Sequence, residues 1–475
     1  MPLVDPLPEG LIPLHGLLTA LGLLIYAVGS HTLHQRRHPS AAIAWVMIIM
    51  LLPEVGVPLY LMFGTRKLPK ANRRPVAPVQ APLPAEVAPL WVQHLTAAMA
   101  MPPTRGYREL RVHQDGREAR DALWEIAGGA RPRLDVCTFI VGRDEFGDAL
   151  LGLLADRARA GVAVRLLVDG AGAWMGGRRD FTAAQAAGVK VARFVPLFRS
   201  PLQWPLRGRT NLRNHRKMVV ADGERLWSGG RNLAGEYFEG RGGREPWVDL
   251  SFDVRGELAE QGALVFDADW SFALRPTRTW RQLGEGRAWG AAPVPARAPA
   301  AQLLPSGPDY ADDTVHTLLL TSCYRARDRI VAVTPYLVPD ESLLAALALA
   351  ARRGVRVDVV VPARSNHRLA DIARHRPMRD LARAGVRLWL SPKVVHAKAV
   401  VIDDHMALVG SVNLDSRSLF LNYELMAGFY APADIERIAA WVEALAAGSA
   451  RYEPAEPSLA RYVGEGLVLW LAFQL

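Results

Sequence analysis

The sequence predicts a layered α/β fold in two similar lobes, preceded by an apolar N-terminal hairpin. Two segments, 148–170 and 341–363, match without a gap, and each has apolar residues at helical spacing, then Gly-Val, then a β-branched run. Further strands are predicted before each helix, at 134–141 and 329–337, and after it, at 187–194 and 384–391. Strand–helix–strand order requires a crossover connection, so we expect parallel pairing in each half.

Composition limits the function classes. The chain has 475 residues, enough for about three domains, and its 22% charged and 50% apolar residues exclude a mainly disordered protein. A net charge of +10 predicts an anionic partner, which is nucleic acid, an anionic membrane surface or a phosphorylated substrate. Only Cys137 and Cys323 are present, which excludes a disulfide scaffold and a Cys-based zinc site. We expect two buried thiols, with one disulfide as the alternative.

Two apolar segments open the chain. Residues 11–30 carry no charged side chain and are long enough to cross a bilayer core of about 30 Å. Asp5 and Glu9 precede them without any Lys or Arg, which argues against a signal peptide. The second segment, 41–63, is interrupted by two prolines, a glycine and Glu54, so it forms either a second crossing or a broken, re-entrant hairpin.

A basic cluster and a proline-rich stretch follow the apolar segments. The cluster consists of Arg66, Lys67, Lys70, Arg73 and Arg74. It outweighs Arg36 and Arg37 in the preceding loop, which favours the cytoplasmic face for the rest of the chain, and it would attract anionic headgroups. The expected divisions are membrane segments over 1–66, a Pro-rich basic tether over 67–104, a first lobe over 105–275, a linker over 276–305, a second lobe over 306–450 and an apolar tail over 451–475.

The repeat ends in the same polar pattern in both halves, H-x-K-x4-D. The first copy gives His215, Lys217 and Asp222, the second gives His396, Lys398 and Asp403, and an Asn follows seventeen positions after each His, at Asn232 and Asn413. In an extended strand, His and Lys two positions apart project from the same face. Two copies with identical spacing argue against an ordinary polar strand surface. Each lysine would repel a metal ion and suits a phosphate oxygen, so no metal site is predicted.

The paired motifs resemble those of the phospholipase D superfamily. The flanks RNHRK (213–217), TPYLVPD (334–340) and GSVNLDSRSLFLNYE (410–424) resemble its bacterial cardiolipin synthase branch. The apolar stretch 42–64 is similar to the membrane hairpin of that branch. The resemblance runs from about residue 11 to about residue 450. It implies two phospholipase D-like α/β sandwich lobes with a shared active site at their interface, a multi-pass protein of the inner (plasma) membrane, and no metal or organic cofactor.

A phosphodiester resists nucleophiles because it is anionic, so the site needs cations on its non-bridging oxygens and a nucleophile that can leave again. Lys217 and Lys398 would supply the cations, and neutral phosphate-binding donors would come from Asn232, Asn413 and Ser411. Gly230 stands where the second half has Ser411, so the halves are not chemically identical. One neutral imidazole would attack phosphorus while the other donates a proton to the leaving alcohol.

The resemblance assigns these two roles and their supports. It implies His215 as nucleophile and His396 as acid/base. It also suggests that Glu424 and Asp249 hold the far ring nitrogens of the histidines, with structural or surface carboxylates as the alternative. Asp222 and Asp403 are expected to buttress the motif strands and their turns rather than to touch substrate.

Two further features leave alternatives open. The stretch 198–213, which the second half lacks, interleaves four arginines with Phe198 and Trp204. This pattern suits an anionic membrane interface or a nucleic-acid backbone, and a solvated basic loop is the alternative. The apolar C-terminal segment 466–475 either packs on the body or dips into lipid.

The leading hypothesis is a transphosphatidylase that acts on phosphatidylglycerol in a membrane. It would join two phosphatidylglycerol molecules through a phosphohistidine, giving cardiolipin and glycerol, in a pocket dry enough for a lipid alcohol to outcompete water. The alternatives are a hydrolytic phospholipase D, a synthase with another donor such as phosphatidylethanolamine, a nuclease of the same superfamily, and a non-enzymatic membrane scaffold. The hairpin argues against the nuclease, so nucleic acid is not an expected partner, and two complete motifs argue against the scaffold.

Overall fold

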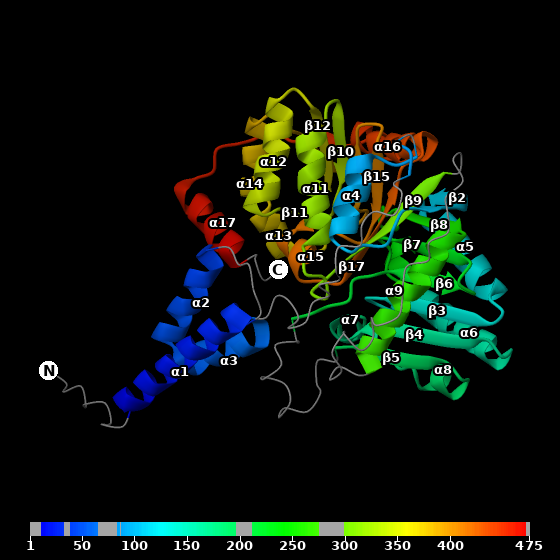
Figure 1. The fold of residues 1–475 in the computed structure, drawn as a ribbon, viewed down its shortest axis with the longest axis horizontal. Coiled ribbons are helices and arrows are strands. Elements are labelled where there is room, and N and C mark those ends of the chain that lie inside the picture. Colours follow the sequence, from blue (N-terminus) through cyan, green and yellow to red (C-terminus); the bar gives the residue numbers. More distant parts are fainter. Residues whose placement is uncertain are drawn as a thin grey trace.

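Two sheets, one in each lobe, organise the protein, and three N-terminal helices extend from the body (Figure 1). The computed structural model describes residues 11–32, 39–64, 83–85, 87–195, 211–274 and 299–471. The basic cluster at 66–74, most of the stretch 198–213 and most of the expected linker lie outside the described residues.

The N-terminal helices are α1 (Leu11–Thr32), α2 (Pro39–Leu51) and α3 (Pro53–Phe63). Pro53 begins α3 because its missing N–H has no partner to lose in a first helical turn. The Tyr60 ring packs against Tyr26 and Trp45, with ring centroids 5.2 and 5.4 Å apart, which ties the three helices together. In the part of the chain that the structure describes, no helix has the length and apolar character required for a membrane crossing. The transmembrane hairpin expected over 1–66 is therefore not supported by the structure.

The first lobe contains a seven-stranded mixed sheet in the order β2-β8-β7-β6-β3-β4-β5. Its strands are β2 (Arg108–His113), β3 (Arg133–Thr138), β4 (Ala163–Asp169), β5 (Lys190–Phe194), β6 (Met218–Ala221), β7 (Arg225–Gly229) and β8 (Ser251–Arg255). One face is covered by α5 (Gly116–Gly129), α6 (Glu145–Arg159) and α8 (Thr182–Ala186). Asp115 and Asp144 cap α5 and α6 by accepting from the N–H groups of Glu118 and Gly147.

The second lobe contains a nine-stranded sheet in the order β1-β9-β17-β15-β14-β10-β12-β13-β18. Its strands are β1 (Arg105–Gly106), β9 (Ala300–Ser306), β10 (Arg329–Val333), β12 (Arg356–Pro362), β13 (Arg387–Ser391), β14 (Ala399–Ile402), β15 (Met406–Gly410), β17 (Glu424–Phe429) and β18 (Ala450–Arg451). One face is covered by α11 (Thr314–Arg325), α12 (Glu341–Arg352) and α14 (His375–Arg383). Two short strands, β11 (Leu337–Val338) and β16 (Leu414–Asp415), pair in parallel beside this sheet.

The predicted repeat and its parallel pairing are confirmed. β3, β4 and β5 are parallel in the first lobe, as are β10, β12 and β13 in the second. In both lobes the strand after the motif lysine, β6 or β14, then pairs antiparallel with the first strand of that set. The inner faces of both sheets, α9 (Glu257–Leu274) and α16 (Pro432–Ala447) share one continuous apolar core. The lobes are therefore packed against each other and are not joined by a connector alone.

Three segments that were expected outside the two lobes pack with the second lobe. α4 (Leu90–Ala98), inside the expected tether, buries Val92 in the core of the second lobe. β9, at the end of the expected linker, is an interior strand of the second sheet. In the expected tail, α17 (Leu459–Leu471) packs Val468 and Leu469 against Val338 and Ala373. These segments belong to the second lobe because their apolar side chains or strand pairing join them to it.

Candidate active site

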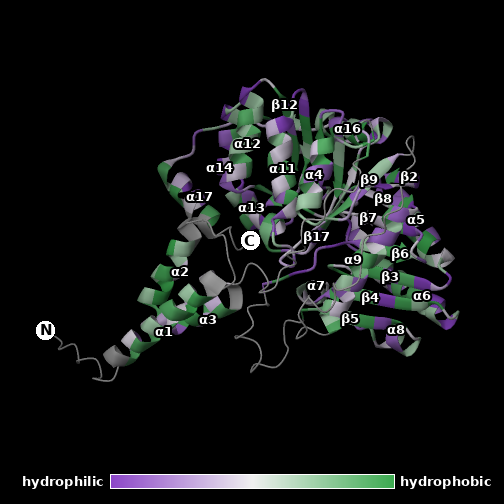
Figure 2. Cartoon of the chain, viewed as in Figure 1, coloured by the Kyte–Doolittle hydropathy of each residue, from purple (hydrophilic) through white to green (hydrophobic). Residues whose placement is uncertain are grey.

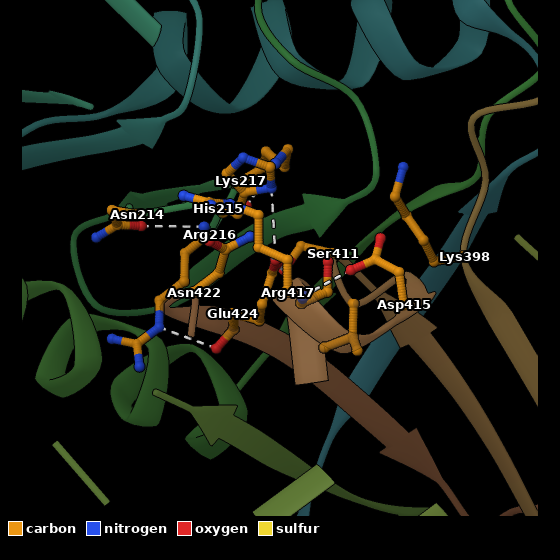
Figure 3. A network of polar contacts seen from close by, with 12 residues as sticks. Asn214, His215, Arg216, Lys217, Lys398, Ser411, Asp415, Arg417, Asn422 and Glu424 are labelled. Carbon is orange, nitrogen blue, oxygen red and sulfur yellow. Dashed lines mark hydrogen bonds and ion pairs between the residues drawn. The ribbon is translucent and has the colours of Figure 1, made fainter. Parts of the chain in front are cut away.

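Each motif histidine belongs to one lobe but is held by the main chain of the other. His215 lies three residues before β6, and its N–H donates to the carbonyl of Tyr423, 2.8 Å away. The N–H of His396 donates to the carbonyl of Val248, 2.7 Å away. Because Tyr423 and Val248 directly precede the two candidate carboxylates, each lobe delivers a carboxylate to the histidine of the other. We call this arrangement the reciprocal clamp. Figure 3 shows His215 with Glu424.

The carboxylates of the reciprocal clamp are fully buried. Asp249 Oδ2 lies 2.7 Å from Nδ1 of His396, and Glu424 Oε1 lies 3.4 Å from Nδ1 of His215. Burial alone would raise the pKa of Asp249, but His396 and Lys398 outweigh it and hold that pKa below its usual range. The pKa of Glu424 is lowered in the same way by His215 and Lys217, against its burial. Both groups are therefore carboxylates at neutral pH, as the support of an imidazole requires.

The two lysines lie beside their histidines. Lys217 Nζ donates to the main-chain carbonyl of His215, and Lys398 Nζ lies 2.8 Å from Nδ1 of His396. Burial lowers the pKa of Lys217 and lowers that of Lys398 to about 7. Such desolvated ammonium groups bind an anionic oxygen more strongly than an exposed lysine does.

The two imidazoles differ in their surroundings. Burial, and then Lys217, lower the pKa of His215, whose side chain is 23% exposed. Burial, and then Lys398, lower the pKa of His396 to about 4, and its side chain is only 10% exposed. The ring of Phe139 lies 4.2 Å from that of His215. Both imidazoles are thus neutral near pH 7, and His215 is the more accessible.

The other predicted phosphate ligands also lie at the site. The Asn232 side-chain amide donates to Tyr237 Oη, 2.8 Å away, and the Asn413 amide lies against Asp415. Their Oδ1 atoms are buried and have no partner among the described residues. Ser411 donates instead to Glu424 Oε2 at 2.5 Å, so its hydroxyl supports the carboxylate behind His215 (Figure 3).

Gly230, the counterpart of Ser411, has a steric reason to be glycine. A Cβ at this position would lie 2.2 Å from Oδ1 of Asp249. In the first lobe, the missing side chain of Gly230 leaves space for the Asp249 carboxylate. In the second lobe, the hydroxyl of Ser411 stands at the equivalent position and donates to Glu424. The difference between the two halves that the sequence shows is thus a difference in how each carboxylate is held.

Asp222 and Asp403 lie at the far ends of β6 and β14, where both have positive φ angles, 59° and 49°. Asp403 accepts three main-chain N–H groups, from Arg327, Asp328 and Arg329, at 3.0, 2.9 and 2.8 Å. Asp222 accepts from the N–H groups of Arg131 and Arg133. Both carboxylates thus tie the turn after β6 or β14 to the start of the neighbouring antiparallel strand, β3 or β10.

A buried polar network surrounds the first histidine. Arg216 donates to Asp269 of α9 at 2.5 Å, and Asn214 donates to the same carboxylate at 2.9 Å. Arg216 also donates to the carbonyls of Glu424 and Ser306, both at 3.0 Å. In the second half, Val395 and Ala397 stand at the positions of Asn214 and Arg216, and a different buried arginine, Arg231, donates to the carbonyl of Asp249 beside His396.

Four residues at the site were not predicted. Phe139 packs on His215, while Tyr237 and Trp247 lie 5.0 and 5.9 Å from the ring of His396. Asp415 caps α15 (Ser416–Phe420), and burial raises its pKa to about 6. Phe139 lies within the predicted strand 134–141 and Asp415 lies in the flank 410–424, so their positions in these segments are the signal that the sequence offers. The prediction of two buried, unpaired thiols at Cys137 and Cys323 is confirmed.

Comparisons with known proteins identify related families and a related fold. Residues 319–446 match a family described as cardiolipin synthase, phospholipase D-like domain, and residues 22–64 match a family described as phospholipase D-nuclease N-terminal. The fold resembles that of the phosphatidylserine synthase of Haemophilus influenzae Rd KW20, with a TM-score of 0.62 at 15% identity over 79% of this chain and 98% of that one.

Relatives at higher identity cover most of the chain. Cardiolipin synthase 1 of Bacillus cereus is 29% identical over 83% of this chain and 81% of its own length. Cardiolipin synthase A of Pseudomonas putida (strain W619) is 32% identical over 434 residues, which are 88% of this chain and 86% of that protein. The paired motifs, their meeting at one site and these relatives together show that the chain belongs to the cardiolipin synthase family of phospholipase D-like proteins.

Proposed function

We propose that the protein is a cardiolipin synthase that transfers a phosphatidyl group from one phosphatidylglycerol molecule to a hydroxyl of a second, giving cardiolipin and glycerol. The observation that carries this proposal is the reciprocal clamp. It brings two neutral, carboxylate-supported imidazoles and two buried lysines to a single site between the lobes.

In the first half-reaction His215 is the nucleophile, because its ring is the more exposed of the two. Its Nε2 bonds to phosphorus as the bond from phosphorus to the glycerol oxygen breaks. His396 gives its proton to that oxygen, so glycerol leaves uncharged. A phosphate anion bound beside Lys217 and Lys398 raises the proton affinity of His396 above that of the empty site, which allows it to arrive protonated.

In the second half-reaction the neutral His396 takes the proton of the incoming lipid hydroxyl. The oxygen bonds to phosphorus, the nitrogen–phosphorus bond breaks, and His215 is regenerated. Lys217 and Lys398 neutralise the non-bridging oxygens, and Asn232 and Asn413 line the same space. Asp249 keeps the proton of His396 on Nδ1, so that Nε2 can accept from the alcohol.

We also propose that the N-terminal helices hold the protein in the inner (plasma) membrane as a multi-pass protein, with its catalytic body on the cytoplasmic face. The support is their apolar surface: Leu17, Leu24 and Ile43 are 66%, 60% and 63% exposed, and Figure 2 shows α1–α3 as mainly hydrophobic. Such side chains gain free energy when lipid replaces water. Labelling of single introduced cysteines from either side of intact vesicles tests this orientation.

The reaction is tested by mass spectrometry of products from phosphatidylglycerol alone, with chelator present. The wild type should form cardiolipin and glycerol, and His215→Ala should form neither. His405→Ala is the matched control, because this histidine is 52% exposed and lies outside the site. Phosphatidic acid as the dominant product would instead identify a hydrolase, and no turnover of phosphatidylglycerol would contradict the proposed donor.

A further inference from the structure

Each lobe exposes apolar side chains at an equivalent place in the repeat. In the first lobe α7 (Gly170–Met175) follows β4 and exposes Trp174 and Met175, which are 52% and 63% exposed. In the second lobe α13 (Arg368–Ala373) comes after β12 and exposes Leu369 and Ile372, which are 46% and 40% exposed. We call these pairs the α7 tip and the α13 tip. Both lie beyond the carboxyl end of a parallel strand, which is the edge where α/β sheets bind ligands (Figure 1).

Helix α7 packs directly on the wall of the active site. A Cβ on Gly172 would lie 1.8 Å from the carbonyl oxygen of Phe139, so α7 approaches that main chain as closely as glycine permits. The ring of Phe139 in turn lies 4.2 Å from His215. At Gly172, helix α7, which carries the tip, is therefore separated from the proposed nucleophile by Phe139.

The α13 tip is connected to the same site from the second lobe. Asn366, two residues before α13, accepts a hydrogen bond of 2.7 Å from Tyr336 Oη. The carbonyl of Tyr336 accepts from the hydroxyl of Thr334, and that hydroxyl accepts from the N–H of Leu414, the residue after Asn413. The two tips thus flank one site from opposite lobes.

Basic side chains accompany both tips. Arg143 and Arg178 lie next to α7, and Arg364 and Arg368 precede or begin α13; all four are exposed. None of the four has a carboxylate partner within the described ranges, whereas the neighbouring Arg179 is paired with Asp148. Isolated exposed apolar residues need no explanation, but apolar pairs bordered by unpaired arginines at both sides of an active site do.

We propose that the α7 tip and the α13 tip insert into the surface of an anionic lipid bilayer, with the four arginines on its headgroups, so that the active site opens onto the lipid. Tryptophan and aliphatic side chains gain free energy at the headgroup boundary, and arginines bind anionic lipid from there. A nucleic acid would match the arginines but not the aliphatic pairs. The inference rests on the proposed function only in that the substrate is a lipid.

The test uses the full chain. Its two native cysteines, Cys137 and Cys323, are buried, so a single cysteine introduced at the surface is the one that reacts with a label. Met175→Cys and Ile372→Cys are labelled with a polarity-sensitive fluorophore and placed in nanodiscs of phosphatidylglycerol or of phosphatidylcholine. Leu349→Cys is the matched control, since Leu349 is 43% exposed at the end of α12, and that end lies on the opposite edge of the sheet. Both tip labels should shift to the blue in phosphatidylglycerol and less in phosphatidylcholine, while the control stays solvent-like. Tip labels as solvent-like as the control in phosphatidylglycerol would overturn the proposal.

A kinetic measurement provides an independent outcome. Replacing Trp174, Met175, Leu369 and Ile372 together with serine should raise KM, expressed as the mole fraction of phosphatidylglycerol in the disc, by about fivefold or more. The kcat should stay within about twofold, because the site itself is intact. An unchanged KM would contradict docking. Cardiolipin formation without a label shift refutes this inference alone, whereas a label shift without cardiolipin refutes the proposed function alone.

Discussion

The contact between Asp249 and His396 provides the sharpest prediction from the site. Asp249→Asn keeps the shape of the side chain, and its Oδ1 can still accept from the N–H of Leu250, now 2.7 Å away. What is lost is the negative acceptor 2.7 Å from Nδ1 of His396. A hydrogen bond to a charged group contributes about 1.5–3 kcal/mol, which corresponds to about 10- to 150-fold in rate. An amide N–H facing Nδ1 also favours the wrong tautomer, so kcat should fall by at least about 10²-fold.

The assay is the initial rate of cardiolipin formation at saturating phosphatidylglycerol, with thermal unfolding as the control for folding. Glu424→Gln is the matched comparison, because its carboxylate lies 3.4 Å from Nδ1 of His215. This distance exceeds that of a strong hydrogen bond, so we expect a smaller loss, of about tenfold. If a folded Asp249→Asn protein kept a third of the wild-type kcat, the proposed support of His396 would be refuted.

Three further predictions concern other residues of the site and its supports. Burial lowers the pKa of Lys398 to about 7, so its charge is lost as the pH rises through that value. Above this pH, kcat/KM of the wild type should fall by about tenfold per pH unit. Arginine stays charged, so kcat/KM of Lys398→Arg should not show this fall between about pH 6 and pH 9. Gly230→Ala places a Cβ 2.2 Å from the Asp249 carboxylate and should lower kcat by about tenfold or more. In the control Gly152→Ala, the new Cβ meets no atom within 4 Å, so this variant should raise the free energy of unfolding by about 0.5–1 kcal/mol. An unchanged kcat in the first variant would show that the carboxylate can move aside. Asp403→Ala removes the acceptor of three N–H groups and should lower the free energy of unfolding by about 2–5 kcal/mol in chemical denaturation; a loss below about 1 kcal/mol would contradict that role.

The fold was predictable where the physics is local. Helical spacing in 148–159, a Gly-Val turn and a β-branched run are enough to specify α6 and β4, and the same pattern specifies α12 and β12. The boundaries of the lobes were not predictable in this way. α4 and β1 lie next to the proline-rich stretch in sequence but pack on the second lobe, since their partners α11 and β9 come about 200 residues later.

The site residues were predictable as members of a pattern, but their pairing was not. Spacing predicts His215 beside Lys217 on one strand face; in the structure both residues precede β6, and Lys217 Nζ donates to the main-chain carbonyl of His215. No local signal links His215 to Glu424, because that contact joins segments 209 positions apart in the sequence. The hydroxyl of Ser411 was expected on phosphate but donates to Glu424, a partner that only the meeting of β15 and β17 supplies.

The reciprocal clamp limits how far the sequences of the two halves can diverge from each other. Reciprocal contacts between equivalent segments of two copies are the arrangement of a symmetric homodimer, and here both copies lie within one polypeptide. Once the two copies are joined, each can diverge separately, as Gly230 and Ser411 or Ala397 and Arg216 have done. We expect neither half to become independent of the other, because each histidine contacts a carboxylate encoded in the opposite half. Two separately expressed halves should therefore be inert alone and active only when they associate.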